Sequence, residues 1–433
     1  MTDLRELAKR IYLETLQATE PDRLIRDRIL LINDHLIFDE NKVDLDRFDE
    51  VVLIGIGKAS LKMGAAVEGI LGDRISRGVL VTDRRSNTRV RSEVLVAGHP
   101  LPDAQSLAAG QKISQVLSAC NARSLIVFLI SGGGSALVEL PSSPAISLED
   151  LRLTNAVLTR CGASIREINI VRKSFSRIKG GGLGLVAGDS TKVGLFLSDV
   201  NSGDIRSIAS NPLLPEEISE ADLLEVMDRF DLRSKLPKSV LSAITEYGFA
   251  GRKVPKSNLT TLMLADNSSA LAAAAAYAKS LDFEVKVVSD FVEGEYQTIA
   301  EDLIDRLLHL KAEFRGQGVC IVSGGEVACE VRGGGIGGRN QEFVLYSAAR
   351  LASLGVEDTA VLSCGTDGID GNSSAAGAVL DAKSVTEAAR QGLDASTFIS
   401  DNDSHSFFKS TGGLVITGPS GNNIRDLRLF VAG

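Results

Sequence analysis

Five glycine-rich loops, each at the end of an apolar run, hold the side chains of this sequence that could do chemistry. They read VVLIGIGKAS (51–60), LIVFLISGGGSALVELP (125–141), IVSGGE (321–326), GGGIGGRNQE (333–342) and VLSCGTDGIDG (361–371). A strand that opens into glycines and then a helix presents unpaired backbone N–H groups, which favour anions and above all phosphate. Several such loops, with a lysine, an arginine and two aspartates among them, predict an enzyme that handles phosphate.

The first loop has two interpretations. Gly55-Ile-Gly57-Lys58-Ala-Ser60 is close to the dinucleotide fingerprint G-x-G-x-x-G, and Asp83 follows the next strand, where a ribose-binding acid would lie. However, Lys58 stands where a pyrophosphate needs only backbone, and a lysine at a helix N-terminus opposes the helix dipole. Its ammonium either points at a transferred phosphoryl group or lies in solvent. The loop is not a Walker A motif, because Val52 occupies the place of its first glycine.

The second loop is the stronger phosphate motif. Three glycines between two serines allow close backbone approach and add two hydroxyl groups; the predicted cradle is Ser131, Gly132, Gly133, Gly134 and Ser135. The alternative is a tight strand–helix turn without a ligand. A serine nucleophile is not favoured, because the elbow pattern G-x-S-x-G does not fit here. Whether His99, in the stiff loop at 98–103, reaches the same site is left open.

Further charged groups follow. Arg172 and Lys179 belong to a run of four cations before the glycines at 180–182, which is either a solvated helix face or a site for a carboxylate or phosphate. Asp199 ends an apolar run, and Asp367 lies in the fifth loop. Such carboxylates suit Mg²⁺, which prefers one or two of them together with phosphate oxygens and water; an Asx-turn is the alternative for the fifth loop.

Arg339 begins a predicted helix in GGRNQE. By the dipole argument used for Lys58, an arginine at this place should bind an anion, and a guanidinium also stabilises charge on a transferred phosphoryl group.

The elements that must position these loops alternate between short apolar runs and helical patterns. The predicted strands of the first half are 51–55, 78–82, 94–97, 124–130 and 193–198, and the predicted helices are 59–71, 103–119, 149–160 and 164–178. Nearly continuous apolar strands in β–α alternation predict a mainly parallel sheet covered on both faces. Ligands of such sheets bind beyond the carboxyl ends of the strands, where the glycine loops lie.

A second domain follows a stretch that is rich in charge and proline, at about 212–257. We place the boundary there, with one domain over 1–245 and another over 246–433. In the second domain the runs at 318–324 and 327–333 are predicted to form a β-hairpin that turns at Gly324–Gly325. Strands at 260–265, 283–288, 359–365 and 413–418 alternate with helices at 267–279, 294–314, 340–352 and 382–391.

Composition narrows the class of protein. The chain has 433 residues and a formal net charge of −9, which argues against a broad nucleic-acid or membrane surface. No apolar stretch approaches the roughly 20 residues that span a bilayer, and the N-terminus reads as an amphipathic helix and not as a signal peptide. The five cysteines form no CxxC pair, which predicts reduced thiols in a cytoplasmic protein. A homodimer is left open.

Taken together, these segments resemble the glycerate 2-kinase family, whose C-terminal half is called the MOFRL domain. The resemblance runs from about residue 50 to 427 through GIGKAS, GHPLPD, SGGGSAL, EINIVRK, IKGGGL, SDVNSGD, SGGE, GGRNQE, GTDGIDG, NDS and TGPSGNN, in this order. It implies two α/β domains, a larger Rossmann-like N-terminal one and a C-terminal one with the MOFRL region at about 315–427, with the active site in the cleft between them.

The resemblance also implies an activity. Members transfer the γ-phosphate of ATP to the 2-hydroxyl of D-glycerate in the presence of Mg²⁺, and the lysine and arginine of their catalytic pair fall on Lys58 and Arg339. The cradle at 131–135 would hold phosphates, and Asp199 or Asp367 would hold Mg²⁺. Candidate substrate-binding residues are Arg172, Lys179, Asn340 and Asp367.

The chain departs from the usual family pattern at Ser174, Gly182, Asn211 and Ser374. These positions lie near the expected binding loops, so they bear on substrate and rate more than on fold. Two other functions stay open beside the kinase. One is a hydroxypyruvate reductase that uses NAD(P)H, built on the near-fingerprint at 55–60. The other is a nucleotide-binding regulator without catalysis.

Overall fold

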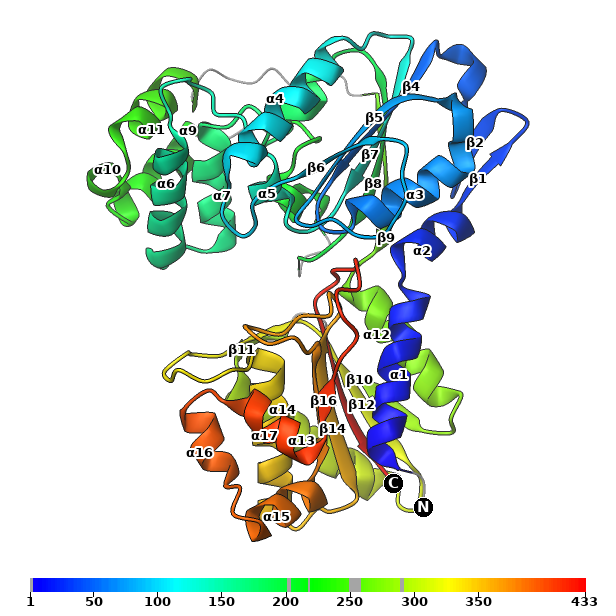
Figure 1. Ribbon diagram of the computed structural model, residues 1–433, viewed down its shortest axis with the longest axis vertical. Helices are drawn as coiled ribbons and strands as arrows, with labels where there is room; N and C mark the ends of the chain where they lie inside the picture. Colours follow the sequence, from blue (N-terminus) through cyan, green and yellow to red (C-terminus); the bar gives the residue numbers. More distant parts are fainter. Residues whose placement is uncertain (1–2, 201–203, 217–218, 249–257, 289–291) are drawn as a thin grey trace. The chain divides into compact units, whose positions relative to one another are not determined.

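The computed structural model describes residues 3–200, 204–216, 219–248, 258–288 and 292–433 (Figure 1). The chain forms two compact units. The N-terminal unit consists of Leu24–Ser198 and Asp204–Leu264, and the C-terminal unit consists of Met1–Arg23, Asp199–Gly203 and Ala265–Gly433.

This division corrects the boundary predicted between 245 and 246. Helix α1 (Leu4–Ala18) joins the C-terminal unit, because its apolar face, with Leu7, Ile11 and Tyr12, is buried against apolar residues of that unit. Strand β9 (Leu259–Ala265) belongs to the sheet of the N-terminal unit. Within the stretch where the boundary was placed, the structure describes helices at Glu220–Arg229, Leu232–Lys235 and Lys238–Ala243, whose apolar residues are buried in a helical cluster.

The N-terminal unit is built around a six-stranded sheet in the order β6-β5-β4-β7-β8-β9. Neighbours from β6 through β8 pair in parallel, as predicted. The strands are β4 (Glu50–Ile56), β5 (Ile75–Thr82), β6 (Glu93–Val96), β7 (Ser124–Ile130), β8 (Thr191–Leu197) and β9. Every residue of β7 is buried, which explains its unbroken apolar sequence. The predicted parallel α/β class is confirmed for this unit.

Helices surround this sheet. They are α3 (Ser60–Leu71), α4 (Ala104–Ser118), α5 (Gly134–Leu137) and α8 (Gly182–Val186), and a separate helical cluster contains α6 (Leu148–Arg160), α7 (Ile165–Ser174), α9 (Glu220–Arg229), α10 (Leu232–Lys235) and α11 (Lys238–Ala243). The cluster has its own apolar core. A short antiparallel sheet, β1 (Ile29–Ile32), β2 (His35–Phe38) and β3 (Asn41–Asp44), follows helix α2 (Pro21–Arg28).

The C-terminal unit has a mixed six-stranded sheet in the order β10-β12-β17-β14-β15-β16. Its strands are β10 (Glu284–Val287), β12 (Val319–Ser323), β14 (Thr359–Gly365), β15 (Gly377–Asp381), β16 (Leu414–Val415) and β17 (Asp426–Ala432). Only the β10–β12 pair is parallel among the pairs of this sheet in the described residues. The predicted hairpin after β12 is wrong, because β12 pairs with β10 and β17 while β13 (Glu326–Ala328) pairs with β11 (Glu293–Glu295).

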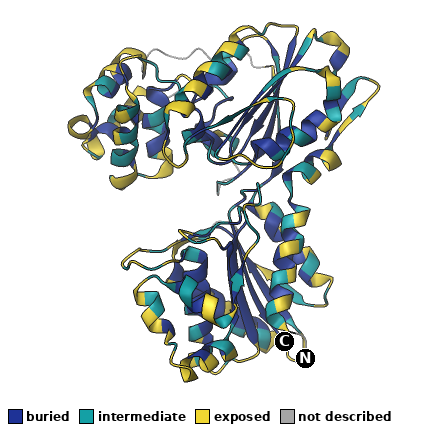
Figure 2. Ribbon diagram, viewed as in Figure 1, coloured by how far each residue is buried: buried dark blue, intermediate teal, exposed yellow. Residues whose placement is uncertain are grey.

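Apolar layers cover both faces of this second sheet (Figures 1 and 2). One layer contains α1 and α12 (Asn267–Lys279). The other contains α13 (Tyr296–Glu313), α14 (Arg339–Ser353), α15 (Ala382–Arg390), α16 (Ala395–Ser400) and α17 (Ser404–Thr411). All five cysteines are free thiols. None of the helices in the described ranges is long and apolar enough to cross a membrane.

Candidate functional site

In the N-terminal unit, Lys58 lies in the turn between β4 and α3, beside the loop that follows β7. The parallel pairing of β4 with β7 brings these two loops together at one edge of the sheet. Gly57 has a φ of 127°, which a residue with a side chain rarely adopts. A Cβ at this position would lie 2.2 Å from the Ser131 Oγ atom, so only glycine allows the two loops to approach this closely.

The backbone amides of this turn are already used within the protein. The Lys58 N–H donates to the Gly132 carbonyl at 3.0 Å, and the Ala59 N–H donates to the Ser131 hydroxyl at 3.1 Å. These two amides, just before α3, are therefore already bonded within the protein, which argues against a pyrophosphate bound by them. The ammonium of Lys58 is the positive group that this turn contributes.

The 131–135 loop lies against Lys58 and His99. Gly133, with a φ of 85°, is the N-cap of the short helix α5. A Cβ on it would lie 3.2 Å from His99 Cδ2 and 3.3 Å from Lys58 Cγ. The structure thus brings together three groups that the sequence shows far apart: the GIGKAS turn, the GHPLPD loop and the SGGGS loop.

Ser135 begins a chain of polar contacts that the sequence did not reveal. Its hydroxyl lies 2.7 Å from the Ser210 hydroxyl, which donates to Asn169 Oδ1 at 3.0 Å. Ser210 stands in a segment in which Ala209, Ser210 and Asn211 all have positive φ, at 50°, 57° and 56°. Such strain costs of order 1 to 3 kcal/mol for each residue and tends to persist at functional sites, where the surroundings enforce it.

Three of the four cations at 172–179 are more buried than a solvated helix face would be, and the exposed one is Arg177. Lys179 is 2% exposed, and its ammonium forms an ion pair with Glu139, which also accepts a 2.5 Å hydrogen bond from Ser176. Burial lowers the pKa of Lys179, and Glu139 opposes that shift. Arg172 donates to Asn155, and burial lowers its pKa as well. Lys179 therefore does contact a carboxylate, but the carboxylate is one of the protein's own.

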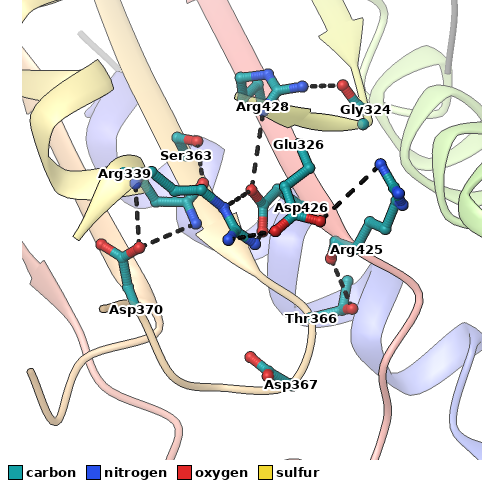
Figure 3. A network of polar contacts seen from close by, with 12 residues as sticks. Gly324, Glu326, Arg339, Ser363, Thr366, Asp367, Asp370, Arg425, Asp426 and Arg428 are labelled. Atoms are coloured by element: carbon teal, nitrogen blue, oxygen red, sulfur yellow. Dashed lines mark hydrogen bonds and ion pairs between the residues drawn. The ribbon is translucent and has the colours of Figure 1, made fainter. Parts of the chain in front are cut away.

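In the C-terminal unit, Arg339 is held by two carboxylates (Figure 3). Its Nε and Nη2 atoms donate to the two oxygens of Asp426 at 2.7 and 3.0 Å, and Nη1 lies 2.5 Å from Glu326. The fork-on-fork contact with Asp426 fixes the plane of the guanidinium. Burial lowers the pKa of Arg339, but Asp426 and Glu326 outweigh that effect and raise it.

A second, completely buried arginine lies behind this pair. Arg428, at 0% exposure, comes within 4.0 Å of Asp426, donates to the Gly324 carbonyl and stacks over the Phe343 ring. Burial lowers the pKa of Arg428 to about 10. Burial alone would raise the pKa of Asp426, but Arg339 and Arg428 hold it below its ordinary value.

The N-terminus of α14 is occupied by a carboxylate of the protein. Asp370, from the GTDGIDG loop, accepts the backbone N–H groups of Asn340 and Gln341 at 3.1 and 2.9 Å and both of their side-chain amides. Burial raises the pKa of Asp370. Asn340 is 1% exposed, and its Oδ1 atom accepts from Ser363 at 2.5 Å. Asn340, predicted to bind substrate, thus holds the loop in place.

Asp199 and Asp367 both contact the segment at 417–425. Asp199 Oδ2 accepts from the side chain of Asn423 at 3.3 Å, and its carbonyl accepts from Arg425 at 2.8 Å. The Asp367 carbonyl accepts from the Ser420 N–H at 3.0 Å, and its Oδ1 accepts from the Ile369 N–H at 3.1 Å. The two predicted Mg²⁺ ligands therefore share one neighbouring segment in the same unit.

Comparisons with known proteins agree with these motifs. Residues 7–245 match a family described as a domain of unknown function (DUF4147), and residues 319–426 match the MOFRL family. The D-glycerate 2-kinase of Thermotoga maritima is 32% identical over 98% of this chain and 97% of its own length. The chain belongs to the glycerate 2-kinase family.

Other members of the family support the assignment. The glycerate 2-kinase of Pyrococcus horikoshii is 33% identical over 99% of this chain and 97% of its own length. The crystal structure of the Thermotoga maritima glycerate kinase has a TM-score of 0.86 at 30% identity, with 99% of each chain covered. A Pyrococcus horikoshii protein of known structure has a TM-score of 0.82, also at 30% identity, over 100% of this chain and 99% of that one.

The donor set of this family member fits Mg²⁺ in the way that kinases use it. Within the described residues, three or more Asp, Glu, His or Cys side chains do not gather into a cage for a metal ion. Mg²⁺ at phosphate-transfer sites needs only one or two carboxylates, with substrate phosphates and water as the other ligands. Asp199 and Asp367 are two carboxylates of the C-terminal unit that both contact the segment at 417–425, so their chemistry suits this ion.

Sequence reasoning missed the residues that hold Arg339. Asp426 and Arg428 stand two positions apart in an apolar stretch, DLRLFVA, so their side chains lie on the same face of β17. Two charged residues that are two positions apart in an otherwise apolar run could have indicated a buried ion pair on one face of a strand. Glu139, Asn169 and Ser210 carried no such signal, because each has its partner far away in the sequence.

Proposed function

We propose that this chain transfers the γ-phosphoryl group of ATP to the 2-hydroxyl of D-glycerate. Family membership supports the proposal, because the chain matches two glycerate 2-kinases over almost their whole length. The observation that carries it is a shared design of two loops. Lys58 lies in the turn that leads into α3, and Arg339 is the first residue of α14. In both places backbone amides are engaged by protein groups, so each place offers a positively charged side chain.

In this proposal Lys58 and Arg339 both neutralise charge on the transferred phosphoryl group. Phosphoryl transfer needs mainly positioning and electrostatic stabilisation, and loss of a phosphoryl-stabilising arginine costs about 10³-fold or more in rate. Arg339 is suited to this role because its guanidinium is fixed before substrate binds. The loop at 131–135, beside Lys58, is proposed to hold phosphate oxygens.

Asp199 and Asp367 are proposed to hold Mg²⁺, which would neutralise phosphate charge when bound. Among the cations of α7, we propose Arg172 for the carboxylate of glycerate, since its partner Asn155 is uncharged. Lys179 and Asn340 are proposed to act as positioning residues, because each is already bound to a buried carboxylate of the protein.

The test is a direct assay with ATP, Mg²⁺ and D-glycerate. ADP release above the substrate-free rate, with 2-phosphoglycerate identified by phosphorus NMR, is the expected result. Formation of 3-phosphoglycerate would contradict the regiochemistry, and no ADP release with D-glycerate would contradict the substrate. If Lys58→Ala and Arg339→Ala both kept full turnover, the assignment of these two residues would be wrong.

A further inference from the structure

The C-terminal unit contains a cavity of about 500 Å³ that none of the catalytic assignments uses. It lies among α13, α14 and α16, where α14 packs against both other helices (Figure 1). Its lining includes Tyr296 and Tyr346 on the helices, Glu295 at the end of β11, and Arg332 and Asn402 on loops. A cavity of this size is within the range that holds small organic ligands.

The walls of the cavity combine aromatic faces with negative charge. Tyr296 and Tyr346 stand edge to face with ring centroids 5.9 Å apart. Burial and the carboxylates of Glu342 and Glu295 raise the pKa of Tyr296. The same two carboxylates, after burial, raise the pKa of the neighbouring Cys329 thiol. Within the lining, Glu295 is the carboxylate beside these rings without an ion pair to a described arginine; Glu342 lies outside the lining, and burial raises its pKa to about 7. A negative charge beside a pair of phenol rings favours a cation over an anion.

The two arginines of the lining do not reverse this preference. Arg332 lies 2.6 Å from Glu330, and Arg350 lies 3.0 Å from Glu301. Each guanidinium therefore has a carboxylate partner. Both carboxylate partners belong to the protein, so a ligand meets neutral pairs at these two places and the negative side chain of Glu295 beside the rings.

One wall of the cavity includes Arg332, the first residue of the loop at 332–338 that leads to Arg339. The N–H groups of Arg332 and Gly333 both donate to Asn402 Oδ1, at 2.7 and 2.9 Å. The Gly335 N–H donates to the Asp401 carbonyl at 3.0 Å. A Cβ on Gly333 would lie 2.1 Å from that same carbonyl, so the loop is packed tightly on this segment. A ligand that contacts Arg332 and Asn402 would restrain the chain that leads to Arg339.

We propose that this cavity binds a small organic cation with an apolar body, and that its occupation restrains the loop at 332–338. The apolar body would lie on the tyrosine rings, and the ammonium or guanidinium group would face Glu295. The site goes beyond the proposed kinase reaction, since it requires neither ATP nor glycerate.

The probe is benzylammonium, with benzyl alcohol as its neutral analogue and benzoate as its anionic analogue, measured by calorimetry on the full chain. We expect benzylammonium to bind at least about tenfold more tightly than the alcohol, and benzoate not to bind. Equal affinity for the three probes, or no binding of benzylammonium at millimolar concentration, would overturn the proposal.

Two variants test whether the ligand binds in this cavity. Tyr346→Ala should weaken benzylammonium binding about tenfold, and Glu295→Gln about threefold, as expected of a lost ring face and of an exposed ion pair. Glu313→Gln, which removes an exposed carboxylate at the far end of α13, is the matched control and should bind as the wild type does. Circular dichroism verifies that each variant is folded. Unchanged affinity in both Tyr346→Ala and Glu295→Gln would place any binding elsewhere.

Hydrogen exchange tests the effect on the loop. With benzylammonium bound, the amides of Arg332 and Gly333 should exchange more slowly than in the free protein. Unchanged exchange at a saturating concentration would overturn the coupling to Arg339. Because neither measurement needs substrate, both remain decisive whether or not the chain phosphorylates glycerate.

Discussion

The ion cluster around Asp426 leads to a prediction about stability. Loss of the Asp426 charge should destabilise the C-terminal unit more than loss of the Arg339 side chain does. Asp426→Asn leaves Arg339 and the fully buried Arg428 without their shared counter-ion. Loss of one partner from a buried pair costs about 3 to 5 kcal/mol, and we expect the middle of that range, about 4 kcal/mol. Arg339→Ala leaves Asp426 with Arg428 at 4.0 Å, and the Arg339 side chain is 35% exposed. Its cost should be lower, about 2 kcal/mol.

Hydrogen exchange of the β17 amides is the assay, because it isolates the C-terminal unit from a chain with two units. The expected difference of about 2 kcal/mol corresponds to about 30-fold faster exchange in Asp426→Asn than in Arg339→Ala. Asp358→Asn is the control: its ion pair with Lys311 lies at the surface, so it should change stability by less than about 1 kcal/mol.

The reasoning would be refuted if Arg339→Ala were as destabilising as Asp426→Asn. That result would mean that Arg428 does not stabilise the Asp426 carboxylate, and that the cluster is a single pair. The double variant adds a second test. Because the two residues are in direct contact, its destabilisation should depart from the sum of the two single effects by about 1 to 3 kcal/mol.

Three further predictions concern other parts of the chain. Lys58→Met should lower kcat by about 10³-fold with little change in thermal stability, whereas Lys62→Met, in the first turn of α3, should keep its rate in the same ADP-release assay; equal losses in the two variants would contradict the proposed role of Lys58. Asn211→Gly should be about 1 kcal/mol more stable than Asn211→Ala in urea unfolding, because both lose the contacts to Leu214 while only glycine relieves the positive φ; an equal cost would show that the backbone there is not strained. Burial raises the pKa of Glu342 from 4.5 to about 7, so the folded chain keeps a proton that the unfolded chain releases, and stability should fall as pH rises from about 5 to 7. Glu342→Gln should remove up to about 3 kcal/mol of that fall, and an unchanged pH profile of urea unfolding would contradict the shifted pKa.

The fold of the N-terminal unit follows from the sequence far better than that of the C-terminal unit. Parallel strands such as β7 are covered on both faces, so their sequences are unbroken apolar runs that can be recognised without the structure. β17 is just as buried, but its first residue, Asp426, and its third, Arg428, are charged. The strand was missed because its two charged residues are unexpected at a central position of a sheet, and their partners, Arg339 on α14 and the Gly324 carbonyl, are distant in sequence.

The boundary between the units could not be read from local sequence either. Prolines and charge at 212–257 predicted a domain boundary, yet the described part of this stretch supplies α9, α10 and α11 to a helical cluster with its own core. The assignment of α1 to the C-terminal unit depends on contacts with residues more than 250 positions away, such as the 2.8 Å hydrogen bond from the Tyr12 hydroxyl to the Gly365 carbonyl. Local patterns identify elements, whereas contacts at such separation decide to which unit an element belongs.

The glycine loops were expected to bind anions through the backbone amides at helix N-termini. A helix N-terminus attracts negative charge, but a protein carboxylate or a neighbouring loop can satisfy that attraction as well as a phosphate can. At α14 the attraction is satisfied by Asp370. In the turn just before α3, the carbonyl of Gly132 and the hydroxyl of Ser131 accept hydrogen bonds from two backbone amides. Each helix start is thereby fixed in position. In the proposed kinase reaction the side chains of Lys58 and Arg339 therefore act on the phosphoryl group in place of these amides. The motif places a positive side chain at or just before a helix start, and its action on phosphate stays a prediction.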